Sequence, residues 1–145
     1  MLTKRWFLAA ACCAALAASD VSAHDGVTHS IEEISEEIAE SPTDAKLYLM
    51  RANEFRIEDR HADALRDIER ARKRGATDEA ALLEGRILLE AGRTADAVAV
   101  LKGHVDARPN SALGHWLLGR AQRFAGDMTA AAASYERAAK QLSNV

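Results

Sequence analysis

Three kinds of residue recur in step along this 145-residue chain, and their spacing constrains the fold more than any other feature. In each set, two small residues are followed by a larger apolar one. The sets are Ala52, Ala64 and Ile68; Gly85, Ala97 and Leu101; and Gly119, Ala131 and Tyr135. The second set follows the first by 33 residues and the third follows the second by 34. Such a period is typical of stacked helical hairpins, so we predict an all-α fold, an α-solenoid of antiparallel hairpins.

The composition agrees with such a fold and narrows the classes of partner. Apolar residues make up 48% of the chain, aromatic residues only 5%, and there are two prolines. This favours helices that pack through small side chains and argues against a sheet. The net charge of -3 provides no strong field toward nucleic acid or an anionic membrane, so we expect neither as a partner.

The first 23 residues have the three-part pattern of a secretory signal peptide. Lys4 and Arg5 precede an uncharged apolar run over residues 6–18, and small residues lead up to Ala23. We predict cleavage after Ala23 and a periplasmic or secreted protein, with no membrane contact beyond this export signal. Two alternatives are an uncleaved anchor and lipidation at Cys12. Both cysteines lie in this segment, so the mature chain would have no disulfide.

The rest of the chain is predicted to form seven helices. Isoleucines spaced by three and four residues indicate the leading one, and Ser30 with Glu33 fits a capping box at its start. Gly75 is expected to end a later helix in a left-handed conformation. The expected ranges are 29–40, 44–58, 61–74, 78–91, 94–107, 111–125 and 128–141. We divide them into a short N-terminal segment with the leading helix, 24–43, and a repeat domain, 44–145.

Residues 44–140 resemble the tetratricopeptide repeat family. The family pattern has a small residue in the first helix, a glycine at the turn, then alanine, a large apolar residue and a third small residue or proline. The matching residues are Ala52, Ala64, Ile68 and Ala71; Gly85, Gly92, Ala97, Leu101 and Pro109; and Gly119, Gly126, Ala131, Tyr135 and Ala138. The resemblance implies three repeats, about 45–77, 78–111 and 112–140, in a right-handed superhelix.

The chain departs from this pattern at two residues and in how it ends. Asp59 stands where the first turn should have its glycine, and His104 replaces the third small residue of the second repeat. We expect His104 either to splay the joint between the second and third repeats or to point its imidazole at solvent. Only a few residues follow the last helix, so the stretch 130–133 is predicted to present an apolar flank. Either Tyr135, Arg137 and Lys140 cover this mildly apolar end, or it mediates weak self-association into a structural homo-oligomer.

No catalytic constellation is visible, and we predict a protein that is not an enzyme and has no cofactor. The resemblance implies instead a scaffold that binds a protein or peptide along a concave face lined by the first helices. In the family the groove-facing positions lie three before, and one, four and five after, the first small residue. They are Leu49, Asn53, Arg56 and Ile57; Leu82, Arg86, Leu89 and Glu90; and Trp116, Arg120, Arg123 and Phe124.

Each of these candidate residues also has a plainer interpretation. Aligned arginines bind carboxylates in pairs of hydrogen bonds, and aromatic side chains anchor partners, so we expect a partner segment that is both apolar and acidic. The arginines would otherwise form a solvated helix face, and Trp116 would lie in the core. The basic run 70–74 is expected to complement a helix dipole, with phosphate binding as its alternative.

A second function comes from the predicted mature terminus. Cleavage after Ala23 would leave His24 first, with His29 close behind. The terminal amine and imidazole of His24, joined by the imidazole of His29, would supply nitrogen ligands for copper or nickel. The alternative is a disordered start that only follows the cleavage rules.

Overall fold

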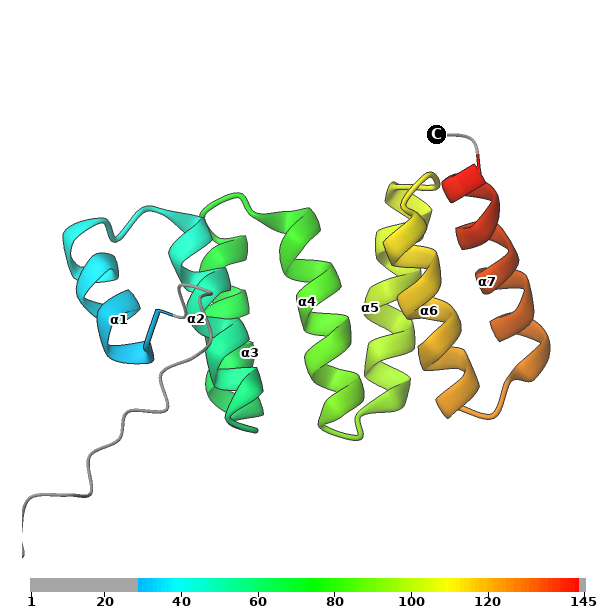
Figure 1. Ribbon diagram of the computed structural model, residues 1–145, viewed down its shortest axis with the longest axis horizontal. Helices are drawn as coiled ribbons and strands as arrows, with labels where there is room; N and C mark the ends of the chain where they lie inside the picture. The colour runs from blue at the N-terminus through cyan, green and yellow to red at the C-terminus, as the bar shows by residue number, and fades with distance from the viewer. Residues whose placement is uncertain (1–28, 144–145) are drawn as a thin grey trace, which may run out of the picture.

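The computed structural model describes residues 29–143, and this part of the chain is a row of seven helices without a strand (Figure 1). The predicted signal peptide and His24 lie outside the described residues. All seven predicted helices are confirmed, with ends within two residues of those expected. The helices are α1 (Ile31–Glu40), α2 (Ala45–Ile57), α3 (His61–Arg72), α4 (Thr77–Glu90), α5 (Thr94–Ala107), α6 (Ala112–Phe124) and α7 (Met128–Ser143).

The helices stack as antiparallel hairpins, and within the described part each helix meets only helices one or two places away along the chain. The hairpins are α2–α3, α4–α5 and α6–α7, with α1 against α2 and the joints made by α3–α4 and α5–α6. The first helices of successive hairpins also meet, as α2–α4 and α4–α6, whereas within the described part the second helices α3, α5 and α7 do not approach one another. The row is therefore bent with α2, α4 and α6 on its inner side, which we call the inner face.

The predicted small residues are the points at which the two helices of a hairpin meet most closely. Ala52, Ala64 and Ala97 are fully buried. A Cβ added to Gly85 would lie 2.5 Å from Cδ2 of Leu101, and one added to Gly119 would lie 2.9 Å from Cδ1 of Tyr135. The larger apolar residue of each set therefore fills the space that the small residue leaves free. This confirms the packing that the repeat pattern predicts.

Two helical glycines allow a direct test of this packing. We expect Gly85→Ala to destabilise the protein by about 1–3 kcal/mol, because Leu101 is fully buried and has no room to move aside. Gly103→Ala in α5 meets nothing within 4 Å and should stabilise it by about 0.5–1 kcal/mol through helix propensity alone. Urea unfolding followed by circular dichroism measures both; equal effects of the two substitutions would contradict the close contact at Gly85.

The turn of the first hairpin has a non-glycine residue in the left-handed region. Asp59 has a φ of 58°, where Gly92 and Gly126 have 73° and 84° in the other two hairpins. Aspartate tolerates this conformation better than most side chains, because its short polar group bonds locally. Asp59 therefore keeps the left-handed conformation that glycine adopts at the other two turns.

His104 does not point at solvent, and in this respect the sequence-based expectation was wrong. Its side chain is 7% exposed at the joint between α5 and α6, and its Nε2 lies 3.0 Å from Oγ of Ser111. The imidazole packs on Gly114 of α6, where an added Cβ would lie 2.7 Å from its Cδ2. The space that a small residue at 104 would have supplied is thus provided by Gly114 on the facing helix.

Because the large His104 packs on the small Gly114, substitutions at these two residues should be strongly coupled in a double-mutant cycle. Gly114→Ala should cost about 1–3 kcal/mol in the native background because its methyl group would collide with the imidazole. In a His104→Ala background the same change should cost less, with a coupling of about 0.5–3 kcal/mol between the two sites. Thermal and urea unfolding of the four proteins give the result. Strictly additive losses would show that Gly114 does not accommodate His104.

A buried ion pair that has no counterpart in the repeat pattern holds the first three helices together. Asp67 of α3 is fully buried and accepts two hydrogen bonds from Arg51 of α2, at 2.6 and 3.0 Å. The Arg51 guanidinium also donates to Oγ of Ser35 on α1, at 2.9 Å. These bonds to Asp67 raise the pKa of Arg51 above its ordinary value. Removal of one partner from such a pair typically costs about 3–5 kcal/mol.

Candidate partner-binding surface

The groove-facing residues expected from the sequence lie along α2, α4 and α6, which form the inner face. Successive repeats lie side by side along this face, as Arg56 of α2 and Glu90 of α4 show. These two residues are 34 residues apart and form an ion pair of 3.0 Å. The leucines among these residues, Leu49, Leu82 and Leu89, are half-buried and pack against the core. They therefore contribute to the stack as well as to its inner surface.

The charged residues on the α2 and α4 part of the inner face are paired with one another. Arg56 donates to both carboxylate oxygens of Glu90 at 3.0 Å and to Oδ1 of Asn53 at 3.0 and 3.2 Å. Arg86 lies 3.3 Å from the same Glu90 carboxylate. The structure thus brings Asn53, Arg56 and Arg86 together, and the two arginines share the single carboxylate of Glu90.

The α6 part of the inner face is different, because both of its aromatic side chains and Arg123 are exposed, while Arg120 is half-buried. Trp116 is 46% exposed and Phe124 is 59% exposed. The core alternative for Trp116 is therefore wrong. The guanidinium carbon of Arg120 lies 5.9 Å from the centroids of both rings, and that of Arg123 lies 5.5 Å from Phe124. We call Trp116, Arg120, Arg123 and Phe124 the α6 stripe.

No carboxylate within residues 29–143 forms an ion pair with either arginine of the α6 stripe. Each guanidinium lies instead within cation–π distance of an exposed ring. Such an arrangement keeps the hydrogen-bond donors of the arginines available to an incoming carboxylate while the rings offer apolar surface beside it. The α6 stripe is therefore the part of the inner face best suited to an acidic and apolar ligand.

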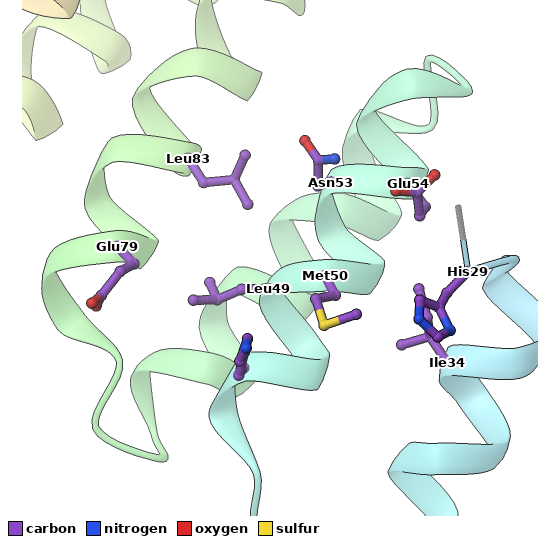
Figure 2. A pocket seen from close by; sticks show the side chains of 9 residues that line it. His29, Ile34, Leu49, Met50, Asn53, Glu54, Glu79 and Leu83 are labelled. Carbon is purple, nitrogen blue, oxygen red and sulfur yellow. The ribbon is translucent and has the colours of Figure 1, made fainter. Parts of the chain in front are cut away.

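A cavity of about 370 Å³ opens between α1, α2 and α4 (Figure 2). Figure 2 shows the Leu49 and Leu83 side chains reaching into the space between α2 and α4. Three of the nine residues that line this cavity were expected from the sequence to be functional: Leu49 and Asn53 as groove positions and His29 as a metal ligand. The nine are His29, Ile34, Lys46, Leu49, Met50, Asn53, Glu54, Glu79 and Leu83.

Two of the cavity residues that were not expected occupy a position that recurs in every repeat. Lys46 and Glu79 lie six residues before the first small residue of their repeats, as does the exposed Leu113 on α6. The groove positions taken from the family pattern do not include this one, although it recurs in all three repeats. Leu83 and Met50 face the cavity because α1 and α4 diverge around α2, and this depends on the three-dimensional arrangement.

The basic run 70–74 is occupied by contacts within the protein. Arg70 reaches Asp67 at 2.6 Å, Lys73 reaches Glu69 at 2.7 Å and Arg74 donates to the Pro42 carbonyl at 2.7 Å. Arg72 forms an ion pair with Glu84. These contacts favour a structural role for the run over phosphate binding.

His29 is the described member of the predicted metal-binding pair. Its Nδ1 lies 3.4 Å from Oε1 of Glu37, and it lines the cavity beside α2. Within residues 29–143 no group of three histidine, cysteine or acidic side chains is arranged to hold a metal ion. The chelate depends on His24, which lies outside the described residues, so it stays a prediction. No helix in this same part of the chain is long and apolar enough to span a bilayer.

Comparisons with known proteins agree with this architecture. The family model for the tetratricopeptide repeat matches residues 49–112. A crystal structure of MamA superimposes with a TM-score of 0.69 at 16% identity, over 79% of this chain and 67% of that one. A second MamA crystal structure gives 0.67 at 17% identity, over 77% and 61%.

The structure called MamA MSR-1 C2 is similar to the same extent, with a TM-score of 0.65 at 16% identity over 79% of this chain and 66% of that one. This chain spans about two thirds of the length of these structures. At such identity the likeness shows a shared fold. A search of curated proteins finds no match.

Proposed function

This chain is a tetratricopeptide repeat protein, and we propose that it is a non-catalytic scaffold outside the cytoplasm that binds a partner segment along its inner face. The fold itself supports a role in protein–protein interaction. The proposal is more specific, because it places the main contact at the α6 stripe and the partner in the class of acidic, apolar segments.

The observation that carries the proposal is the difference between the two parts of the inner face. Arg56 and Arg86 share the carboxylate of Glu90, whereas Arg120 and Arg123 have no carboxylate partner within the described residues. Bidentate arginine–carboxylate pairs fix the orientation of a ligand, and exposed tryptophan is among the residues most enriched at binding hot spots. A partner that alternates acidic and apolar side chains would satisfy both features of the α6 stripe.

The cavity between α1, α2 and α4 offers a second contact for the same partner. Its apolar wall includes Leu49 and Leu83 (Figure 2), and Lys46 is also among the residues that line it. A segment that runs across the first helices would place one apolar side chain there while its acidic part engages the α6 stripe. Two such separated contacts favour an extended or helical peptide over a small molecule.

The first prediction of this proposal concerns affinity. With Trp6→Phe, Trp116 is the only tryptophan of the chain, so its fluorescence reports binding at the α6 stripe. We expect a peptide of alternating leucine and aspartate to bind, and a leucine–lysine peptide not to bind. Arg120→Ala should weaken the complex by about thirtyfold, corresponding to the roughly 2 kcal/mol that a hot-spot residue contributes.

The matched control is Arg137→Ala, which removes an exposed arginine from α7 outside the inner face. It should leave the affinity of the leucine–aspartate peptide unchanged. The same two variants, used as baits for cross-linking in the native cell, identify the natural partner by its selective loss with Arg120→Ala. Equal binding by both variants would contradict the assignment of the α6 stripe.

The second prediction concerns location, which rests on the pattern of residues 1–23. We expect the protein isolated from its native cell to be found outside the cytoplasm and to begin at His24, as read by intact mass. Ala23→Arg should block cleavage because the residue before the scissile bond must be small. A cytoplasmic protein that retains residues 1–23 would contradict the proposed location and remove the basis for the copper chelate.

A further inference from the structure

One face of α7 carries an apolar stripe that is exposed except at its central residue, Tyr135, which packs on Gly119 of α6. Its residues follow the spacing 4, 3, 4, 3, which keeps them within a narrow arc of the helix and matches the seam of a coiled coil. We call them the α7 stripe, and they are Met128, Ala132, Tyr135, Ala139 and Leu142.

The exposure of the α7 stripe is unusual for this protein. Leu142 and Met128, at its two ends, are 71% and 62% exposed, the highest values among the large apolar side chains of residues 29–143. Ala132 and Ala139 are exposed as well, and Tyr135 is half-buried because its ring lies against Gly119. An apolar helix face of this regularity is the kind of surface that other helices cover.

The equivalent face of α5 is covered within the chain. Val98, Leu101 and Val105 lie 34 residues before Ala132, Tyr135 and Ala139. Leu101 and Val105 are buried in one cluster with residues of α6, and Val98 packs against that cluster. The corresponding face of α3 meets α4 in the same way, whereas among the described helices α7 meets only α6. The α7 stripe thus continues, in register, the interface that joins successive hairpins.

We propose that the α7 stripe packs against the α7 stripe of a second copy, in an antiparallel, two-fold symmetric dimer. The stripe alternates large, small, large, small, large, so its order of sizes is the same when read from either end. A two-fold axis near Tyr135 places Met128 opposite Leu142 of the partner copy, and Ala132 opposite its Ala139. The alanines let the two backbones approach closely, while the large residues at both ends are removed from water.

The geometry also limits how far the assembly grows. Both copies use the same surface, so the interface closes at two and does not extend into a fibre. A single helix pair buries less than the roughly 1,600 Å² of a standard interface, so we expect the dimer to form in a concentration-dependent way. The proposal does not depend on the proposed partner-binding function, because it concerns another helix and is read from molecular mass.

Two adjacent exposed alanines provide the first test. Ala132→Glu places a charge in the α7 stripe, and Ala133→Glu places the same charge on α7 outside it. In sedimentation velocity on the full chain we expect the native protein to shift from monomer to dimer as its concentration rises. Ala132→Glu should raise the dissociation constant about tenfold or more, equivalent to 1.4 kcal/mol, and Ala133→Glu should leave it unchanged.

Two results of this first test would overturn the proposal. One is a native protein that stays monomeric up to millimolar concentration, and the other is an equal effect of the two substitutions. Circular dichroism shows whether each variant retains its helices, and a folded Ala139→Glu variant repeats the test at the partner position if Ala132→Glu does not fold.

Single-cysteine cross-linking tests the antiparallel arrangement itself. In a chain with Cys12→Ser and Cys13→Ser, we expect a mixture of Ala132→Cys and Ala139→Cys proteins to form a mixed disulfide. Each protein alone should form little, because the same residue of the two copies would be separated by about 10 Å along the helix axis, beyond the reach of a disulfide. Efficient cross-linking of either protein with itself, or the absence of any mixed disulfide, would overturn the arrangement.

Discussion

The rest of this structure depends on one contact within each hairpin. In it, a glycine or alanine on the first helix packs against a large apolar side chain on the second. Gly85 receives Leu101, and Gly119 receives Tyr135, at separations that leave no room for a methyl group. These contacts hold the two helices of a hairpin close together. Because the same contact recurs in step along the chain, it fixes which side of each first helix reaches the inner face.

The helices and their order could be predicted from the sequence because both depend on periods that repeat along the chain. The network of Arg51, Asp67 and Ser35 could not. The residues at the positions of Asp67 in the later repeats are Val100 and Ser134, so no charge recurs there. Only the approach of α1, α2 and α3 shows that Arg51 and Asp67 meet, 16 residues apart in sequence. The packing of His104 on Gly114 could not be predicted either, because the small residue that the repeat pattern places on α5 is replaced by one on α6.

The candidate site was predictable in its placement but not in its electrostatics. Repeat position alone located Arg56, Arg86 and Arg120 on the first helices. It did not show that Arg56 pairs with Glu90, since that ion pair crosses between α2 and α4. The exposure of Trp116 was equally undecided, because its equivalents Leu49 and Leu82 are half-buried against neighbouring helices. The two parts of the inner face therefore differ in free charge although they share one pattern.

Contacts in the described part of the chain join only neighbouring helices or successive first helices, and none connects α1 with α7. A small rotation at each joint therefore adds along the row, so the distance between its ends changes without the opening of any single interface. Under tension, such a molecule extends as a short spring does. A change in the pitch of the stack would tighten or loosen the contacts of a ligand that lies across several first helices. The strain would be shared among all the joints.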